Sequence, residues 1–284
     1  MSTRKDKFSK KDSFFMNLAF NLARERSGLT GKNPPVGCVI VKNDEIISVG
    51  QTGLKGRPHA EFNAIKSCKK SLKGATLYSS LEPCTHYGIT PPCANLIIKS
   101  KIKKVIFSII DVDNRTRDKS LKLFKFKNII AKKGLLKKEG NKIYKPYVWN
   151  KLKNLPFITG KLAVSKDNFI YSKKKLKITN KYSNKITHLL RFRNDSILIS
   201  SKTLNKDNPK LNCRLKGLAS FSPKRIILDR RLSIKKNSYI FSTSANKNTV
   251  LFHNSSNRKK INLLKKKGIK LIKLSVNKDN LFDL

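Results

Sequence analysis

The chain has 284 residues, of which 38% are hydrophobic, and its formal net charge is +47. This length is enough for two domains of ordinary size. The sequence contains no run of about 18 apolar residues, so no transmembrane helix is expected. The basic N-terminal stretch lacks the continuous apolar core and the cleavage site of a signal peptide. We therefore expect a cytoplasmic protein.

The excess of basic residues fits two interpretations. A surface with this charge attracts polyanions, so a nucleic-acid-binding protein is one class that fits. However, lysine far outnumbers arginine, and the lysines are spread over the whole chain. This distribution favours a compositional bias over a dedicated basic face. A nucleic-acid-directed activity is kept as an alternative.

The first half of the chain alternates between helical and strand patterns. The apolar residues from 13 to 26 recur at helical spacing, with Asp12 or Ser13 as a possible cap. The elements expected after this helix are strands 36–41 and 45–50, helix 58–68, strand 75–81, helix 91–100, strand 103–110, helix 117–126 and strand 128–131. This order predicts a three-layer α/β/α domain whose sheet is largely parallel after the first hairpin.

The second half has a similar alternation after a stretch, residues 141–156, that is interpreted as a connector. The expected elements are a strand pair within 157–171, helix 183–193 and strands 195–200, 223–229, 248–253 and 269–275. We expect two α/β domains, residues 1–150 and 154–284.

Three of the first domain's side chains are suited to bind a metal. His59 opens one helix in "RPHAEFNAI", and Cys84 and Cys93 lie in "LEPCTHYGITPPCANLII", where a strand ends and a helix begins. Since the chain has five cysteines, an odd number, a disulfide framework is not expected. One imidazole and two thiolates with a water in the fourth place is the pattern of a catalytic zinc site. Helix N-termini favour the thiolate form.

Glu61 follows His59 by two residues and completes the pattern. Zinc lowers the pKa of a bound water from ~15.7 to ~7–9, and a carboxylate on the same helical turn can take up the proton. The order H-x-E and P-C…C is typical of zinc-dependent deaminases. Taken alone, His59 and Glu61 would fit an ordinary helix start, so the prediction depends on all four residues together. His86 either lines the pocket or packs, and Asn33 either faces the pocket or forms a turn.

These stretches, together with "NPPVGCVIV", "KLAVSKD" and "LLRFRNDSILISSKTLNKDNPKLNCR", resemble the bifunctional riboflavin biosynthesis protein family RibD. The resemblance covers nearly the whole chain. Its most specific feature is the spacing of Cys84 and Cys93, because nucleic-acid-editing deaminases generally have C-x-x-C. It implies a cytidine-deaminase-like domain, followed by a truncated dihydrofolate-reductase-like α/β domain that uses NADPH.

The resemblance implies zinc-dependent deamination of 2,5-diamino-6-(5-phosphoribosylamino)pyrimidin-4-one to 5-amino-6-(5-phosphoribosylamino)uracil, with a small pyrimidine nucleotide as substrate and a homo-oligomeric enzyme. It implies that His59, Cys84 and Cys93 bind zinc, that Glu61 carries the proton and that Asn33 touches the substrate. The residues that it implies in the second domain are Ala163, Thr203 and Asp207 for NADP, and Arg191, Leu211 and Arg214 for the substrate.

The sequence departs from the family at several positions. Ile89 stands where the family usually has Lys or Arg before "TPPC", and the loop 111–120 differs, so both changes bear on how the substrate's phosphate is held. Asn168 replaces a glycine, and "KKKLKI" replaces a motif that holds cofactor and substrate. The chain ends at Leu284, before the family's glycine-rich turn. The sequence thus predicts a deaminase with a shortened reductase half, and a bifunctional enzyme completed by oligomerisation is the alternative.

Overall fold

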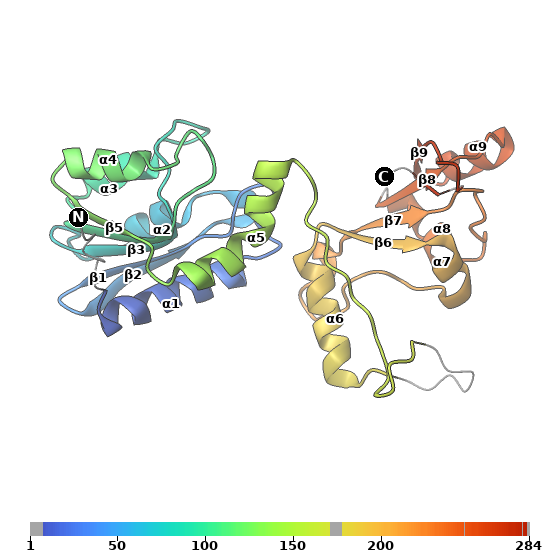
Figure 1. The fold of residues 1–284 in the computed structure, drawn as a ribbon, viewed down its shortest axis with the longest axis horizontal. Coiled ribbons are helices and arrows are strands. Elements are labelled where there is room, and N and C mark those ends of the chain that lie inside the picture. The colour runs from blue at the N-terminus through green and yellow to red at the C-terminus, as the bar shows by residue number, and fades with distance from the viewer. Residues whose placement is uncertain (1–7, 171–177, 247, 280, 283–284) are drawn as a thin grey trace. The chain divides into compact units, whose positions relative to one another are not determined.

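The computed structural model describes residues 8–170, 178–246, 248–279 and 281–282 (Figure 1). The chain divides into two compact units, residues 1–160 and 161–284. Each unit is described by itself below. In the described parts of the chain, no helix combines the length and the apolar character needed to cross a bilayer.

The first unit alternates strands and helices in the predicted order. Its elements are α1 (Lys10–Glu25), β1 (Gly37–Lys42), β2 (Glu45–Gln51), η1 (Leu54–Gly56), α2 (Ala60–Ser67), β3 (Thr76–Leu81), α3 (Cys93–Lys99), β4 (Lys104–Ile109), α4 (Lys119–Phe126), β5 (Ile130–Lys133) and α5 (Lys137–Lys153). The sheet order is β2-β1-β3-β4-β5. Strand β1 pairs with β2 and β3 antiparallel, and β3, β4 and β5 run parallel. The prediction of an α/β fold with a sheet that is parallel after the hairpin is confirmed.

Helices cover both faces of this sheet, as Figure 1 shows. On one face, strand residues such as Val39 and Tyr78 pack with α1. On the other face, Ile40, Leu77 and Phe107 pack with α2, α3 and α4. Successive strand residues point to opposite faces, so the alternation along each strand supplies both cores. The result is the expected three-layer arrangement.

Helix α1 begins earlier than the sequence pattern indicates. Its N-cap is Ser9, whose Oγ accepts from the Asp12 backbone N–H, while the Asp12 carboxylate accepts from the Ser9 backbone N–H. This reciprocal pair is a capping box. Asp12 is therefore the third helical residue, not the cap.

Residues 141–156 are mostly helical, so the prediction of a connector is wrong. Helix α5 continues through Pro146, a residue that normally breaks a helix interior. Tyr144 anchors the helix to the sheet, because its side chain is fully buried and its hydroxyl lies 2.6 Å from Ser80 Oγ. Gly140 allows a close approach, since a Cβ there would lie 2.6 Å from Ser108 Oγ. Tertiary packing thus outweighs the local effect of the proline.

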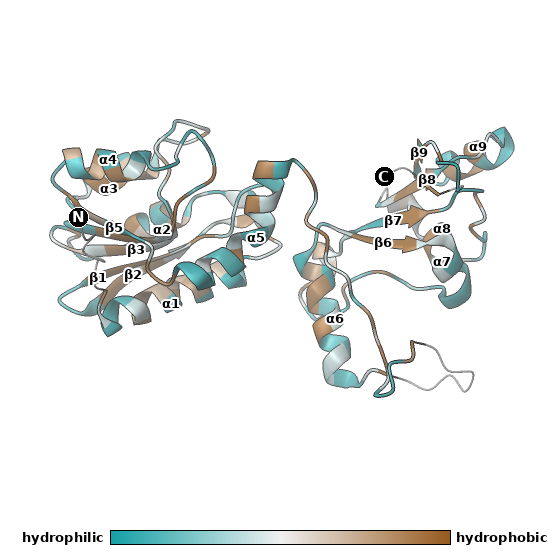
Figure 2. Ribbon diagram, in the orientation of Figure 1, coloured by the Kyte–Doolittle hydropathy of each residue, from teal (hydrophilic) through white to brown (hydrophobic). Residues whose placement is uncertain are grey.

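The second unit contains a parallel sheet in the order β6-β7-β8-β9. Its elements are α6 (Lys181–Arg193), β6 (Ser196–Ser200), α7 (Ser201–Asp207), η2 (Ala219–Phe221), β7 (Lys224–Leu228), α8 (Tyr239–Ser242), η3 (Ser244–Asn246), β8 (Thr249–His253), α9 (Arg258–Lys266) and β9 (Lys270–Lys273). Figure 2 shows hydrophobic colour on β6 and β7 and hydrophilic colour on α9. The hydrophobic core of the second unit includes Leu204, Ile227 and Leu251.

The predicted strand pair within 157–171 does not form in the described residues 157–170. Ile158 and Leu162 are 83% and 72% exposed, so their alternation buries no face. Only the turn is present: the Ser165 N–H donates to the Phe169 carbonyl at 2.8 Å. Asn168 takes a left-handed conformation there, with φ 65°. Most of the "KKKLKI" segment lies outside the described residues.

Candidate zinc centre and second-unit site

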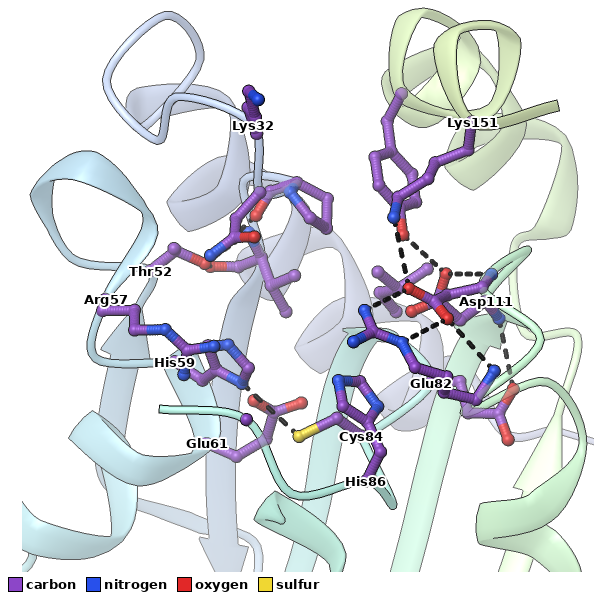
Figure 3. A pocket seen from close by; sticks show the side chains of 18 residues that line it. Lys32, Thr52, Arg57, His59, Glu61, Glu82, Cys84, His86, Asp111 and Lys151 are labelled. Atoms are coloured by element: carbon purple, nitrogen blue, oxygen red, sulfur yellow. Dashed lines mark hydrogen bonds and ion pairs between the residues drawn. The ribbon is translucent and has the colours of Figure 1, made fainter. Parts of the chain in front are cut away.

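A cavity in the first unit lies at the edge of the sheet where β3 and β4 end (Figure 3). Parallel strands bring their carboxyl ends to one edge, and the helices that follow them begin there. His59 is the N-cap of α2, and Cys93 is the first residue of α3. Cys84 lies in the connection from β3 to α3. The fold therefore brings together three side chains from separate segments.

The three predicted metal ligands converge. His59 Nδ1 lies 3.5 Å from Cys84 Sγ and 3.4 Å from Cys93 Sγ. All three donor atoms lie within 4.8 Å of one another. One imidazole and two thiols fit Zn²⁺, and three protein ligands leave a fourth position open for chemistry. The donor set therefore fits a catalytic zinc ion.

The two thiols differ in how readily they ionise. A hydrogen bond from the Cys93 thiol lowers the pKa of Cys84 to about 4. The Cys93 backbone N–H also donates to Cys84 Sγ at 3.3 Å. The Cys84 thiolate in turn raises the pKa of the Cys93 thiol. Metal binding needs both groups as thiolates, so it is coupled to the loss of any proton that they carry.

Glu61 lies in the first turn of α2 and lines the cavity. The residue is 4% exposed, and Ser79 Oγ donates to its Oε1 at 3.0 Å. Burial raises the pKa of the Glu61 carboxyl above its ordinary value. A carboxyl whose pKa is nearer to neutrality can accept a proton and return it. The geometry therefore suits the predicted proton carrier.

Glu82 is an important residue that the sequence analysis missed. It follows β3 directly, is 3% exposed and lines the same cavity. Its carboxylate accepts from the backbone N–H groups of Asp111, Asp118 and Ser120 at 3.1–3.2 Å, and from Ser120 Oγ at 2.8 Å. Glu82 therefore holds the loop after β4 against the cavity. An acidic residue between an apolar strand and "PC" was the available signal.

A network of charged residues forms the cavity wall opposite His59 (Figure 3). Asp113 accepts from Arg115 Nε and Nη2 at 2.9 and 2.7 Å, and from Lys151 Nζ at 3.2 Å. The Arg115 guanidinium holds the pKa of Asp113 well below its usual range. Tyr147 donates to Asp111 Oδ1 at 2.8 Å. Helix α5 thus contributes to the site through Tyr147 and Lys151.

Asn33 and His86 both line the cavity. Asn33 Nδ2 donates to the Gly56 carbonyl at 3.0 Å, and Thr30 Oγ1 donates to the Asn33 carbonyl at 2.7 Å. Asn33 therefore both lines the pocket and stabilises a turn, so the two predicted roles occur together. His86 Nδ1 lies 3.1 Å from Thr116 Oγ1. The cavity position is compatible with substrate contact for both residues.

In the second unit, the predicted substrate residues come together. Arg191 Nη1 donates to the Asn212 carbonyl at 3.1 Å, and the Arg214 N–H donates to His188 Nδ1 at 3.2 Å. These bonds hold the segment from Leu211 to Arg214 against α6. Burial, and then the charge of Arg214, lower the pKa of Arg191. Arg191 Nε is buried without a hydrogen-bond partner, so an anion would satisfy it.

The predicted cofactor-binding residues are more accessible to solvent than the buried part of Arg191. Thr203 and Asp207 are exposed on α7. Side chains four residues apart lie on one helix face, so one ligand can contact both. Ala163 is half-buried in the extended segment before the 165–169 turn. Among the residues that the structure describes, no hydrogen bond joins Ala163 to α7.

Comparison with known families agrees with both halves of this description. Residues 9–109 match the cytidine and deoxycytidylate deaminase zinc-binding region. Residues 156–283 match the RibD C-terminal domain. The first match includes the convergent His59, Cys84 and Cys93. Fold and site together define a zinc-binding deaminase that is followed by a second α/β domain.

Similarity to individual proteins extends over most of the chain. The riboflavin biosynthesis protein RibD of Aquifex aeolicus is 33% identical over 263 residues, 92% of this chain and 73% of that protein. RibD of Bacillus amyloliquefaciens is 33% identical over 94% of this chain and 72% of its own length. The chain belongs to the RibD family of riboflavin biosynthesis proteins.

Solved structures give the same result. RibD of Acinetobacter baumannii matches with a TM-score of 0.79 at 28% identity, covering 96% of this chain and 76% of that chain. A diaminohydroxyphosphoribosylaminopyrimidine deaminase/5-amino-6-(5-phosphoribosylamino)uracil reductase from Thermotoga maritima matches with a TM-score of 0.79 at 32% identity. That match covers 93% of this chain and 80% of the other. The predicted family and the α/β architecture are confirmed.

Proposed function

We propose that the first unit deaminates 2,5-diamino-6-(5-phosphoribosylamino)pyrimidin-4-one to 5-amino-6-(5-phosphoribosylamino)uracil. The observation that carries this proposal is the convergence of His59, Cys84 and Cys93 beside the buried Glu61 in one cavity. The names of the RibD relatives support the pathway, and the Thermotoga maritima protein carries this activity in its name.

In this proposal, His59, Cys84 and Cys93 hold the zinc ion, which supplies Lewis acidity toward water when bound. Glu61 accepts a proton from the attacking water and delivers it to the nitrogen that leaves as ammonia. The Ser79 hydroxyl orients the Glu61 carboxylate for both transfers. Oxygen from water thereby replaces the ring amino group. Asn33 and His86 contact the substrate from the cavity wall.

The direct test compares the wild type with Glu61→Gln. Removing the proton carrier should lower kcat about 10³-fold, within the range for a positioned acid–base group, while bound zinc is unchanged. Product mass should rise by about one unit in the wild type, because oxygen replaces NH. Glu45→Gln, on the exposed start of β2, is the matched control. Normal turnover by Glu61→Gln would refute the mechanism.

We infer a second activity, NADPH-dependent reduction of the ribosyl group, from the second unit. Arg191 and Arg214 lie together, and the buried Arg191 Nε has no partner. Two guanidinium groups suit a phosphate because each can bind two oxygens. Ala163, Thr203 and Asp207 would hold NADPH, which supplies the hydride. Oxidation of NADPH in the presence of the deaminated product tests this activity, and its absence would refute it.

The domain limits 1–150 and 154–284 and a cytoplasmic location remain proposals, as does assembly into a homo-oligomer. The end of α5 at Lys153 supports a boundary near that residue. A homo-oligomer fits the alternative in which a second copy completes the reductase half. Light scattering of the purified chain at several concentrations measures the assembly. A monomer at all concentrations would refute it.

A further inference from the structure

The cations that line the first unit's cavity fall into two groups. Arg115 and Lys151 belong to the wall built by the loop after β4 and by α5, whereas Arg57 and Lys32 belong to the side that carries His59 (Figure 3). The substrate proposed for this cavity carries a dianionic phosphate. The phosphate requires a cation that is not already neutralised, so the two groups must be compared.

The first group is neutralised within the protein. Arg115 places two guanidinium nitrogens on Asp113, and Lys151 Nζ contacts the same carboxylate. A phosphate on this wall would have to compete with Asp113 for both cations. Asp111 adds a second carboxyl group beside them. This wall is therefore unfavourable for a phosphate.

The second group has no carboxylate partner within the described part of the chain. Among the residues that the structure describes, no ion pair involves Arg57 or Lys32. Arg57 Nη1 instead donates to the neutral Thr90 Oγ1 at 2.7 Å. This bond orients the guanidinium and leaves most of its donors available.

The guanidinium of Arg57 also lies against the loop that carries Ile89. A Cβ on Gly88 would come within 3.1 Å of Arg57 Nη2, so the glycine leaves room for the guanidinium beside the loop backbone. Ile89 lies between Gly88 and Thr90 and is 87% exposed. Position 89 supplies no charge, and the positive charge at this rim comes from Arg57 instead.

We propose that Arg57 binds the 5′-phosphate of the deaminase substrate, with Lys32 adding charge on the same side of the cavity. This inference rests on the proposed deaminase function. The planar guanidinium donates two parallel hydrogen bonds, one to each of two phosphate oxygens. Thr90 holds it in place, and the ring of the substrate then lies toward His59 and Glu61. Arg57 thus makes the cavity selective for a nucleotide over a nucleoside.

The test uses the full-length zinc-loaded protein with two substrates, the diaminopyrimidine nucleotide and its dephosphorylated nucleoside. Arg57→Gln should raise KM for the nucleotide about 10- to 100-fold, the effect of losing hydrogen bonds to a charged group. It should leave KM for the nucleoside and the zinc content unchanged. Lys73→Gln, which removes an exposed charge outside the cavity, is the matched control and should change neither.

Two further variants separate phosphate binding from loop structure. Thr90→Val removes the hydrogen bond between Arg57 and Thr90 but keeps the Arg57 cation. This variant should therefore retain most of the preference for the nucleotide over the nucleoside. Arg57→Gln combined with Ile89→Lys returns a cation to the same rim and should restore at least part of that preference. An equal loss with both substrates in Arg57→Gln, or no loss with either, would overturn the proposal.

Calorimetry of ribose 5-phosphate binding provides a measurement that does not depend on turnover. It is made in the Arg191→Gln background, so that the phosphate site proposed for the second unit does not contribute. Arg57→Gln should weaken this binding about 10-fold or more. If the wild type binds ribose 5-phosphate through Arg57 but does not deaminate the nucleotide, the proposed function fails and the phosphate site stands. If it deaminates the nucleotide and Arg57→Gln binds ribose 5-phosphate normally, only the phosphate site fails.

Discussion

The two candidate sites differ in how far the protein completes them without a ligand. In the first unit, Glu61 and Glu82 are 4% and 3% exposed, and both accept hydrogen bonds from neighbouring groups. In the second unit, Thr203, Asp207 and Arg214 are exposed, and the buried Arg191 Nε has no partner. The first site is preorganised by internal hydrogen bonds, whereas the second site leaves Arg191 Nε unsatisfied and its other polar residues exposed.

This difference follows from the chemistry that each site is proposed to perform. Positioned acid–base groups act through exact geometry, so the fold must hold them before the substrate arrives. A cofactor brings its own reactive atoms, and the protein mainly binds and orients it. Four substitutions, taken from the largest expected effect to the smallest, test whether the contrast is real.

The largest effect is expected at the metal centre. Cys93→Ser removes one of the three metal donors and should lower zinc affinity by more than about 100-fold. Mutation of a residue that only hydrogen-bonds a metal ligand already lowers metal affinity about 10- to 100-fold. Competition with a chelator measures this affinity. Cys68→Ser removes a thiol outside the cluster and should leave it unchanged. Equal zinc affinity in the two variants would show that the convergent donors do not form the site.

The next effect concerns the second unit. Arg191→Gln should raise KM of the reductase reaction about 10- to 100-fold, since a phosphate loses charge-assisted hydrogen bonds. It should reduce the stability of the second unit by no more than about 0.5–1.5 kcal/mol, the net value of its one hydrogen bond to the Asn212 carbonyl. Arg193→Gln, two residues further along α6 and exposed, is the control. A large loss of stability in Arg191→Gln would contradict the contrast between the two sites.

Glu82→Gln tests the preorganisation of the first unit. The glutamine amide offers one acceptor oxygen where the carboxylate offers two, so at least one N–H from the loop after β4 loses its partner. We expect a loss of about 1–3 kcal/mol in unfolding free energy, the cost of an unsatisfied buried group. Urea denaturation measures it. Glu25→Gln, exposed at the end of α1, should be neutral.

The smallest effect is a pH dependence from Asp113. Its pKa is lowered in the folded state, chiefly by Arg115, so its charged form adds stability above the unfolded pKa of about 4. That contribution is lost as the pH falls below about 4. Asp113→Asn should therefore be less stable than the wild type at pH 6, and the difference should shrink toward pH 2. A constant difference across this range would contradict the assignment.

The zinc donors and Glu61 could be predicted because their residue types carry chemistry and occur in a recognisable order. Glu82 could not be predicted in the same way. It acts on backbone N–H groups 29 to 38 residues further along the chain, and any residue has such a group. Arg57 was missed for a similar reason, since its partner Thr90 lies 33 residues away.

Errors in the fold prediction have physical causes too. Residues 141–156 were interpreted as a connector, but packing of Tyr144 against Ser80 keeps α5 helical through Pro146. Alternating apolar residues suggested strands within 157–171, but alternation produces a strand only where one face is buried. Ile158 and Leu162 remain exposed. In both places long-range packing decided the structure: the sheet holds α5 through Tyr144, whereas Ile158 and Leu162 stay exposed.

The hydrogen bonds of Glu82 have a consequence for how this chain tolerates mutation. Three of its four donors are backbone N–H groups, of Asp111, Asp118 and Ser120. Since these groups persist whatever side chains the loop carries, the residues between them can be exchanged while the loop keeps its course. One buried carboxylate thereby lets this stretch accumulate substitutions, and a cavity wall of altered sequence can retain its shape.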